Sequence, residues 1–454
     1  MYRDPDIKPV DITLESVTKS QLLPGPGIAM LRHPESAKES AAALTFGRLT
    51  SGHCHFAVLN YLYCDFGREV SCDLGYLSWW HPLRAWLASP LSHNIVIVDG
   101  AAIDRSSGGN AELFTDGRIS AVRAAAPGCY ARKTDRYERT LVNIPRSEGR
   151  QYLADFFYVK GGRKHLFVFH GDGDRFDAPA GAVFKDAPLP ANLKDDTGKK
   201  YVKNTASAPV AQGVHTGTWH YDAQIRTTLH LALERSMTLY RGTGSALRDQ
   251  RNPYHEPPMH ILMAESEGED TLFASVLNAA KTPEQDVRVE QLPVTASGTR
   301  ASALRITHSD GVDLVIHQTQ EGGTVRLADY PDFTQNARTA VVRFRDGKVN
   351  FLWCEDGSVS IAGKTLDAGR NVTGTVLAID TAAKKVTIQW NQTAPEIAAG
   401  RRMIFTDYED GVYKVAKSER KQRQSVLTMT PDETLRLEKG CKVLFPAWAE
   451  MTVK

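Results

Sequence analysis

The sequence predicts an all-β protein, built as a large antiparallel layered β-sandwich with a smaller C-terminal β-domain behind it. Two observations favour this fold class. Apolar and polar residues alternate with a period of two, and DG, GG and TG pairs separate such runs into hairpins. Helical periodicity is almost absent, and its best candidates are 35–44 and a short piece at 84–88. The clearest alternating stretches are 93–100, 163–172, 303–319, 339–361 and 371–390.

Changes in this pattern along the chain predict the domain organisation. Residues 1–27 are polar, finish in LLPGPG, and are expected to form a connector. The sandwich domain is expected over 28–328. It ends where LADYPDFTQNAR loses the alternation, and short hairpins over 335–454 predict the small C-terminal β-domain. The polar stretch 186–213 has the composition of a surface loop.

Composition and short motifs limit the classes of function that the chain can have. The 454 residues carry a formal charge of +2, so no overall field favours nucleic acid or another polyanion, and a basic site must be local. No apolar run approaches the roughly 20 residues that span a bilayer, and the first residues lack the apolar core of a secretory signal. The six cysteines form no C-x-x-C pair, and most are expected to be buried thiols. Phosphate-loop, dinucleotide and serine-hydrolase motifs are absent from the sequence, so nucleotide-dependent and serine-hydrolase functions have no support.

A metal site is predicted from the spacing of four residues. His53 and His55 would point to the same face if they lay on one strand. Asp73 follows the apolar strand REVSC, and His93 opens HNIVIVDG. Two imidazoles and a carboxylate from neighbouring strands match the ligand preference of zinc. Histidine pairs on strands are also common as ordinary hydrogen-bonded groups, so spacing alone leaves both alternatives open.

The order G-H-x-H, a strand ending in D-x-G, and H-N before a strand ending in V-D-G resembles the heparinase II/III-like polysaccharide lyases. These motifs lie within 47–100. Further segments are similar to the family pattern over roughly 25–330: PGIAMLR, TDRYERTLVNI, YLADFFYVKGGRKHLFVFHGDGD and TLFASVLNA. The resemblance implies a supersandwich-like fold and periplasmic or secreted localisation.

The resemblance also implies roles for the four residues. His53 would face substrate and act in catalysis, whereas His55, Asp73 and His93 would hold a structural zinc. A hydrogen-bonded cluster without metal is the alternative for the last three. Between Asp73 and His93, the candidate substrate-binding residues are Tyr76, Trp79, Trp80 and Arg84. The aromatic rings could stack on a sugar and Arg84 could pair with a carboxylate or sulfate, with core packing and a surface ion pair as the alternatives.

The implied reaction is β-elimination of a glycan that contains uronic acid, such as heparan sulfate or alginate. It requires a group that neutralises the carboxylate, a base and an acid. In the family a helical toroid that precedes the sandwich supplies most of these, and this sequence has no toroid pattern. We therefore expect a lyase half, which is either a fragment or works with a separate helical polypeptide, or else a glycan-binding or structural module without turnover.

Overall fold

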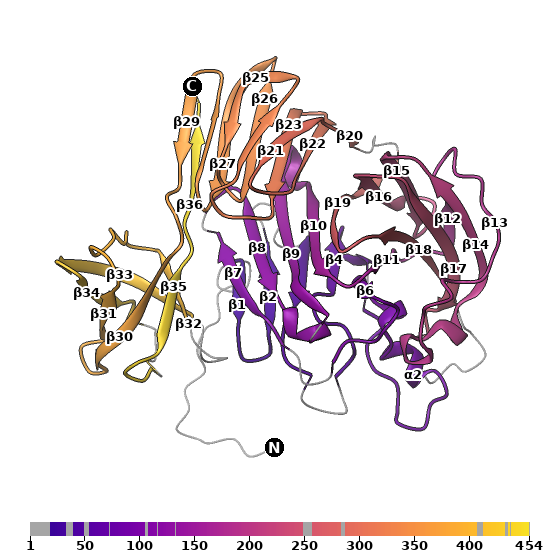
Figure 1. Cartoon of the computed structure of the whole chain (residues 1–454), viewed down its shortest axis with the longest axis horizontal. Coiled ribbons are helices and arrows are strands. Elements are labelled where there is room, and N and C mark those ends of the chain that lie inside the picture. The colour runs from indigo at the N-terminus through magenta and orange to yellow at the C-terminus, as the bar shows by residue number, and fades with distance from the viewer. Residues whose placement is uncertain are drawn as a thin grey trace.

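The structure is a computed structural model. It describes residues 19–32, 40–49, 54–71, 73–104, 108–115, 117–131, 133–247, 257–282, 287–405, 412–431, 435 and 437–453. Within these ranges, five antiparallel sheets stack in four layers, and a closed barrel stands beside them (Figure 1). The all-β prediction and the layered sandwich are confirmed. No helix in this part of the chain has the length and apolar character needed to cross a membrane.

The outermost layer consists of two sheets side by side. Sheet A contains β1 (Gln21–Leu23), β2 (Ile28–Leu31), β3 (Ala41–Thr45), β4 (Tyr61–Asp65) and β5 (Arg68–Ser71). Sheet B contains, in spatial order, β13 (Lys185–Asp186), β14 (Lys203–Val210), β17 (Met237–Ser245), β18 (Pro258–Glu267), β11 (Lys164–His170) and β6 (Val96–Val98).

Sheet C is the second layer and the largest sheet. Its order is β12 (Arg175–Asp177), β15 (Gly213–His220), β16 (Ile225–Leu233), β19 (Asp270–Lys281), β10 (Gln151–Gly161), β9 (Thr134–Pro145), β8 (Ser120–Ala125) and β7 (Asn110–Phe114). Both faces are covered. Leu141 packs into the core shared with sheets A and B, and Val142 packs into the core shared with the third layer. Because both faces of sheet C are buried, the sequences of its strands are nearly continuous apolar runs.

Sheets D and E form the third and fourth layers. Sheet D contains β20 (Arg288–Gln291), β22 (Ala301–His308), β23 (Gly311–Gln318), β26 (Thr339–Arg345), β27 (Lys348–Glu355) and β36 (Trp448–Thr452). Sheet E contains β21 (Val294–Ser297), β24 (Thr324–Leu327), β25 (Tyr330–Gln335), β28 (Ser358–Ile361) and β29 (Lys364–Asp367). A separate apolar core joins the two sheets.

The barrel closes around its own core in the order β30 (Val372–Asp380), β31 (Lys385–Trp390), β34 (Gln424–Met429), β33 (Val412–Lys421), β32 (Arg402–Phe405) and β35 (Lys442–Phe445). In the chain it is inserted between β29 and β36, and β36 returns to pair with β27 (Figure 1). Strand pairing therefore crosses the boundary expected near 328–335. β25 occupies that segment and pairs with β24 and β28, so the barrel stands apart from the layered sheets while the rest of 335–454 belongs to them.

Among the residues that the structure describes, helical segments are few and short. They are α2 (Arg84–Leu87) and the 3-10 turns η1 (Pro90–Ser92), η2 (Pro127–Tyr130), η3 (Ser147–Gly149), η4 (Asp195–Thr197) and η5 (Lys199–Tyr201). The helix expected near 84–88 is confirmed as α2. The helix expected over 35–44 is wrong at its described end, because Ala41–Thr45 form β3, bonded on both sides to β2 and β4. Sheet pairing satisfies this backbone, and its small side chains fit between layers, so tertiary context overrides the local helical preference. The loop expected over 186–213 likewise contains β14.

Candidate metal centre

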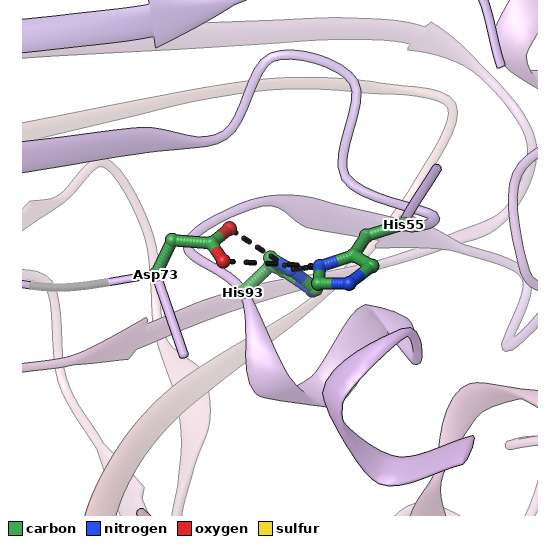
Figure 2. Close-up of side chains that lie close together, drawn as sticks. All are labelled: His55, Asp73 and His93. Carbon is green, nitrogen blue, oxygen red and sulfur yellow. Dashed lines mark hydrogen bonds and ion pairs between the residues drawn. The ribbon is translucent and has the colours of Figure 1, made fainter. Parts of the chain in front are cut away.

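Three of the four predicted site residues come together beside sheet A. The side chains of His55, Asp73 and His93 point toward one another (Figure 2). His55 Nδ1 lies 3.3 Å from His93 Nε2 and 3.8 Å from Asp73 Oδ1, and His93 Nε2 lies 3.2 Å from Asp73 Oδ2. His53, the predicted catalytic residue, lies outside the described residues.

The segments that carry His55 and His93 are not the strands from which the metal site was predicted. Asp73 follows β5, as expected, but His55 belongs to an irregular segment before β4, where Phe56 N–H donates to Ala88 O (3.0 Å). His93 directly follows η1 rather than opening a strand. The segment is held by turns and by the neighbouring loop, so His55 does not lie on a strand, although the ligand set that the strand argument suggested does converge.

Apolar anchors position the loop that carries Asp73 and His93. Leu74, Leu77, Leu87 and Leu91 are buried in one cluster against the outer face of sheet B. In α2, Trp86 Nε1–H donates to Ser245 O of β17 (2.7 Å). The loop is therefore packed at both ends, which brings Asp73 back to His93 across 19 intervening residues.

Hydrogen bonds fix the orientation of His93. Its ring is buried, and Nδ1 lies 2.8 Å from Ser89 O, a carbonyl that can only accept. The Nδ1 atom therefore carries the proton, and the lone pair of Nε2 faces Asp73 and His55. In the His55 tautomer whose Nδ1 carries no proton, three electron-pair donors converge, and a metal ion can bind between them. In the other tautomer, the alternative without metal, His55 Nδ1–H donates to His93 Nε2.

The spacing and the electrostatics fit a metal. Two ligands each about 2.0–2.1 Å from a tetrahedral zinc lie about 3.3–3.4 Å apart, close to two of the three donor separations here. Burial and, secondarily, the neighbouring His93 lower the pKa of His55 to about 4, which keeps its imidazole neutral. Burial raises the pKa of Asp73, but His93 and the Gly75 N–H outweigh it and hold that pKa well below its ordinary value. Neutral imidazoles and an ionised carboxylate are the forms that bind zinc.

A second set of residues supports these ligands. Asn60 Nδ2–H donates to Asp73 Oδ2 (3.2 Å), while Asn60 Oδ1 accepts from the backbone N–H of Asn94 (2.9 Å). Asn94 Nδ2–H donates to Tyr61 O (3.1 Å) and Ser71 Oγ (2.7 Å). Sequence reasoning gave Asn60 no role, and its position between two apolar runs offered no signal.

Arg139 also supports the site, and the sequence analysis did not identify it. It is fully buried in β9, and its NH1 group donates to Leu59 O (2.7 Å) and Asn94 O (2.5 Å), next to the segments that carry His55 and His93. Its other edge donates to both carboxylate oxygens of Asp155 (2.8 and 2.6 Å). The signal was available, since Tyr137, Arg139 and Leu141 alternate on one face of a buried strand.

Among the predicted substrate-binding residues, Tyr76 lines the cavity of the metal centre, and Arg84 and Trp79 stack next to it. A cavity of about 360 Å³ is lined by His55, Asp73 and Tyr76, among others. The Arg84 guanidinium lies between two rings, 4.4 Å from the centroid of Tyr76 and 3.8 Å from that of Trp79. Trp80 is 94% exposed. The rings are therefore surface features rather than core packing, and Arg84 stacks on them.

Two further histidines of the sequence are placed elsewhere. His170 is buried and its Nε2 lies 2.7 Å from Ser92 O, so it supports the His93 turn. His220 lies 2.6 Å from Asp177 Oδ2 and beside Arg175, in a separate cavity.

Comparisons with known proteins find likeness only among solved structures. No family model and no curated protein matches the sequence. The similar structures are heparinase III and heparan sulfate lyase chains. A heparinase III gene product has 11% identity and a TM-score of 0.43, covering 72% of this chain and 42% of that one. Heparan sulfate lyase HepC from Pedobacter heparinus has 13% identity and a TM-score of 0.40, covering 68% and 42%. A crystal structure of heparinase III has 11% identity and a TM-score of 0.43, covering 66% and 43%. This chain thus spans less than half of each, and at these scores the likeness carries no argument about activity.

Proposed function

We propose that this chain is the metal-bearing sandwich portion of a lyase that cleaves acidic, uronic-acid-containing polysaccharides outside the cytoplasm. The observation that carries the proposal is the convergence of His55, Asp73 and His93, with donor atoms at zinc-like separations. The motif order around these residues, which resembles the heparinase II/III-like family, supports the same function.

In this proposal the metal is structural. A zinc ion bound by His55, Asp73 and His93 would tie the segment before β4 to both ends of the loop between β5 and β6. The chain's own residues then act on the glycan. His53, two residues from His55, transfers a proton at the reacting sugar, as the resemblance implies. The remaining acid–base groups would come from a helical domain, on the same or a separate polypeptide.

Sugar contact is assigned to the loop between Asp73 and His93. Trp79 and Trp80 present ring surface to solvent, and stacking on Trp79 and Tyr76 holds the Arg84 guanidinium beside the cavity of the metal centre. Aromatic faces suit the C–H face of a sugar, and a guanidinium suits its carboxylate or sulfate. The same exposed tryptophans favour a second candidate, a glycan-binding module without turnover.

Metal analysis is the first test. Purified protein should contain about one zinc per chain, and the double variant His55→Ala/Asp73→Ala should lose it together with thermal stability. His215→Ala is the matched control, because His215 lies in β15 and contacts Ala211 O rather than the centre. Equal zinc content in all three proteins would sink the metal assignment.

Activity then separates the two candidates. With the helical domain of a heparinase III-like lyase supplied, cleavage of a uronan should appear as ultraviolet absorbance of the unsaturated product. His53→Ala should lower the rate by about a hundredfold to ten-thousandfold while zinc content stays constant. Binding of uronan with no turnover under any such combination would favour the non-catalytic module.

A further inference from the structure

A second cavity, of about 310 Å³, lies where the sheets and the barrel meet. Its wall includes Phe46 after β3, Glu112 of β7, Arg136 and Glu138 of β9, and Ile404 and Leu444 of the barrel. This volume is within the range of small-molecule sites, which combine apolar walls with a few fixed polar groups.

The second cavity shares a wall with the cavity of the metal centre. Gly47 and Arg48 line both. Backbone bonds hold this wall from two sides, because Phe46 N–H and Gly47 N–H donate to Gly27 O (2.6 and 3.1 Å) and Gly109 N–H donates to Phe46 O (2.8 Å). The approach is so close that a Cβ on Gly47 would lie 2.5 Å from Pro26 O. The Gly47–Arg48 segment therefore borders both cavities and is held in place from both sides.

Buried ion pairs fix the polar part of the second cavity. Arg338 is almost fully buried and its NH2 group donates to Glu138 Oε1 (2.5 Å). Arg123, also buried, donates to Glu112 Oε2 (2.5 Å) and to both oxygens of Glu355 (3.2 and 3.1 Å). These arginines hold Glu112 and Glu138 in place, and each carboxylate retains acceptor capacity beyond the bonds it makes.

Arg136 differs from these buried arginines. Its side chain is 41% exposed, and its ion pair is a 3.5 Å contact with Glu138, whose other oxygen accepts from Arg338. A partly exposed guanidinium thus lies beside two anchored carboxylates and the apolar side chains of Phe46 and Leu444. Hydroxyl groups can donate to the carboxylates, an anionic group can pair with Arg136, and a C–H face can pack on the apolar wall.

We propose that this second cavity binds an acidic sugar unit, with Arg136 as the residue that selects its carboxylate or sulfate. The choice of sugar class rests on the proposed function. Because Gly47 and Arg48 line both cavities, the two sites are neighbours, and a polysaccharide that passes over this segment could contact both.

Calorimetric titration of the full chain tests this proposal. The probe is a tetrasaccharide of alternating glucuronic acid and N-acetylglucosamine, and the neutral comparison is the N-acetylglucosamine tetramer. The acidic probe should bind at least about tenfold more tightly than the neutral one, and Arg136→Ala should weaken it about tenfold, the value of one charge-assisted hydrogen bond. Arg288→Ala is the control, since Arg288 is a 77% exposed arginine in β20 that pairs with Glu290.

The remaining variants separate this site from the metal centre. His55→Ala should lose zinc and keep most of the binding, so the proposed function can fail while this site stands. Unchanged affinity in Arg136→Ala overturns the proposal. So does binding that disappears in Trp80→Ala and persists in Arg136→Ala, because the sugar would then lie on the tryptophan loop. Equal affinity for inorganic sulfate would overturn the assignment to a sugar.

Discussion

Replacement of Arg139 by Met should lower both the stability of the protein and its affinity for zinc, because the buried Arg139–Asp155 pair contributes to both. Both side chains are essentially inaccessible, at 0% and 1% exposure. Removal of the guanidinium leaves the Asp155 carboxylate buried without its partner, which costs about 3–5 kcal/mol of stability. It also removes the donors to Leu59 O and Asn94 O, which lie near His55 and His93 in the chain.

Zinc affinity should therefore fall as well. Residues that hold ligating groups in place typically contribute about 10- to 100-fold in metal affinity, and Arg139 holds both segments at once. The double variant Arg139→Met/Asp155→Leu removes the unpaired charge and should recover most of the lost stability. It cannot restore the two carbonyl bonds, so its zinc affinity should stay reduced.

Urea unfolding followed by circular dichroism measures the stability, and zinc titration against a chelator measures the affinity. The matched control is Arg343→Met. Arg343 makes an equally paired contact with Asp313 (2.7 and 2.8 Å) at the interface of sheets C and D, and its loss should lower stability alone. Unchanged zinc affinity in Arg139→Met, or an equal loss in Arg343→Met, would refute the reasoning.

Two further predictions concern acid stability and the exposed loop. Burial raises the pKa of Asp313, but hydrogen bonds from Arg343 and His308 outweigh it and lower that pKa from 3.8 to about 2. The folded-state pKa lies below the unfolded one, so this stabilisation is present above pH 4 and is lost as the pH falls through 2. Between pH 4 and pH 2, the free energy of unfolding of wild type should fall by about 2 kcal/mol more than that of Asp313→Asn. Unfolding free energies that fall in parallel with pH in the two proteins would contradict this role of Asp313. Trp80→Ala should leave the free energy of unfolding within about 0.5 kcal/mol of wild type, because the ring is 94% exposed. It should weaken uronan binding about two- to tenfold by calorimetry, and full retention of affinity would exclude sugar stacking at Trp80.

The sequence predicted those features that depend on local periodicity. Alternation identified the strands of the hairpins β22–β23, β26–β27 and β30–β31, since period-two burial is imposed residue by residue. The chemistry of His55, Asp73 and His93 was also visible, because residue type is local information. The role of His53 stays a prediction.

Other features depend on contacts between distant segments. Ala41–Thr45 have helical composition but form β3, because β2 and β4 supply hydrogen-bond partners on both sides. The return of β36 to β27 across the whole barrel left no trace in the alternation.

The metal centre itself combines both kinds of information. The sequence by itself determined which side chains could bind a cation. Only the tertiary structure decided that they meet, because that depends on the leucine anchors of the loop on sheet B and on a buried arginine from sheet C that holds two carbonyls. A charge buried between layers is stable only when every partner is in place, and those partners come from segments that no local pattern connects.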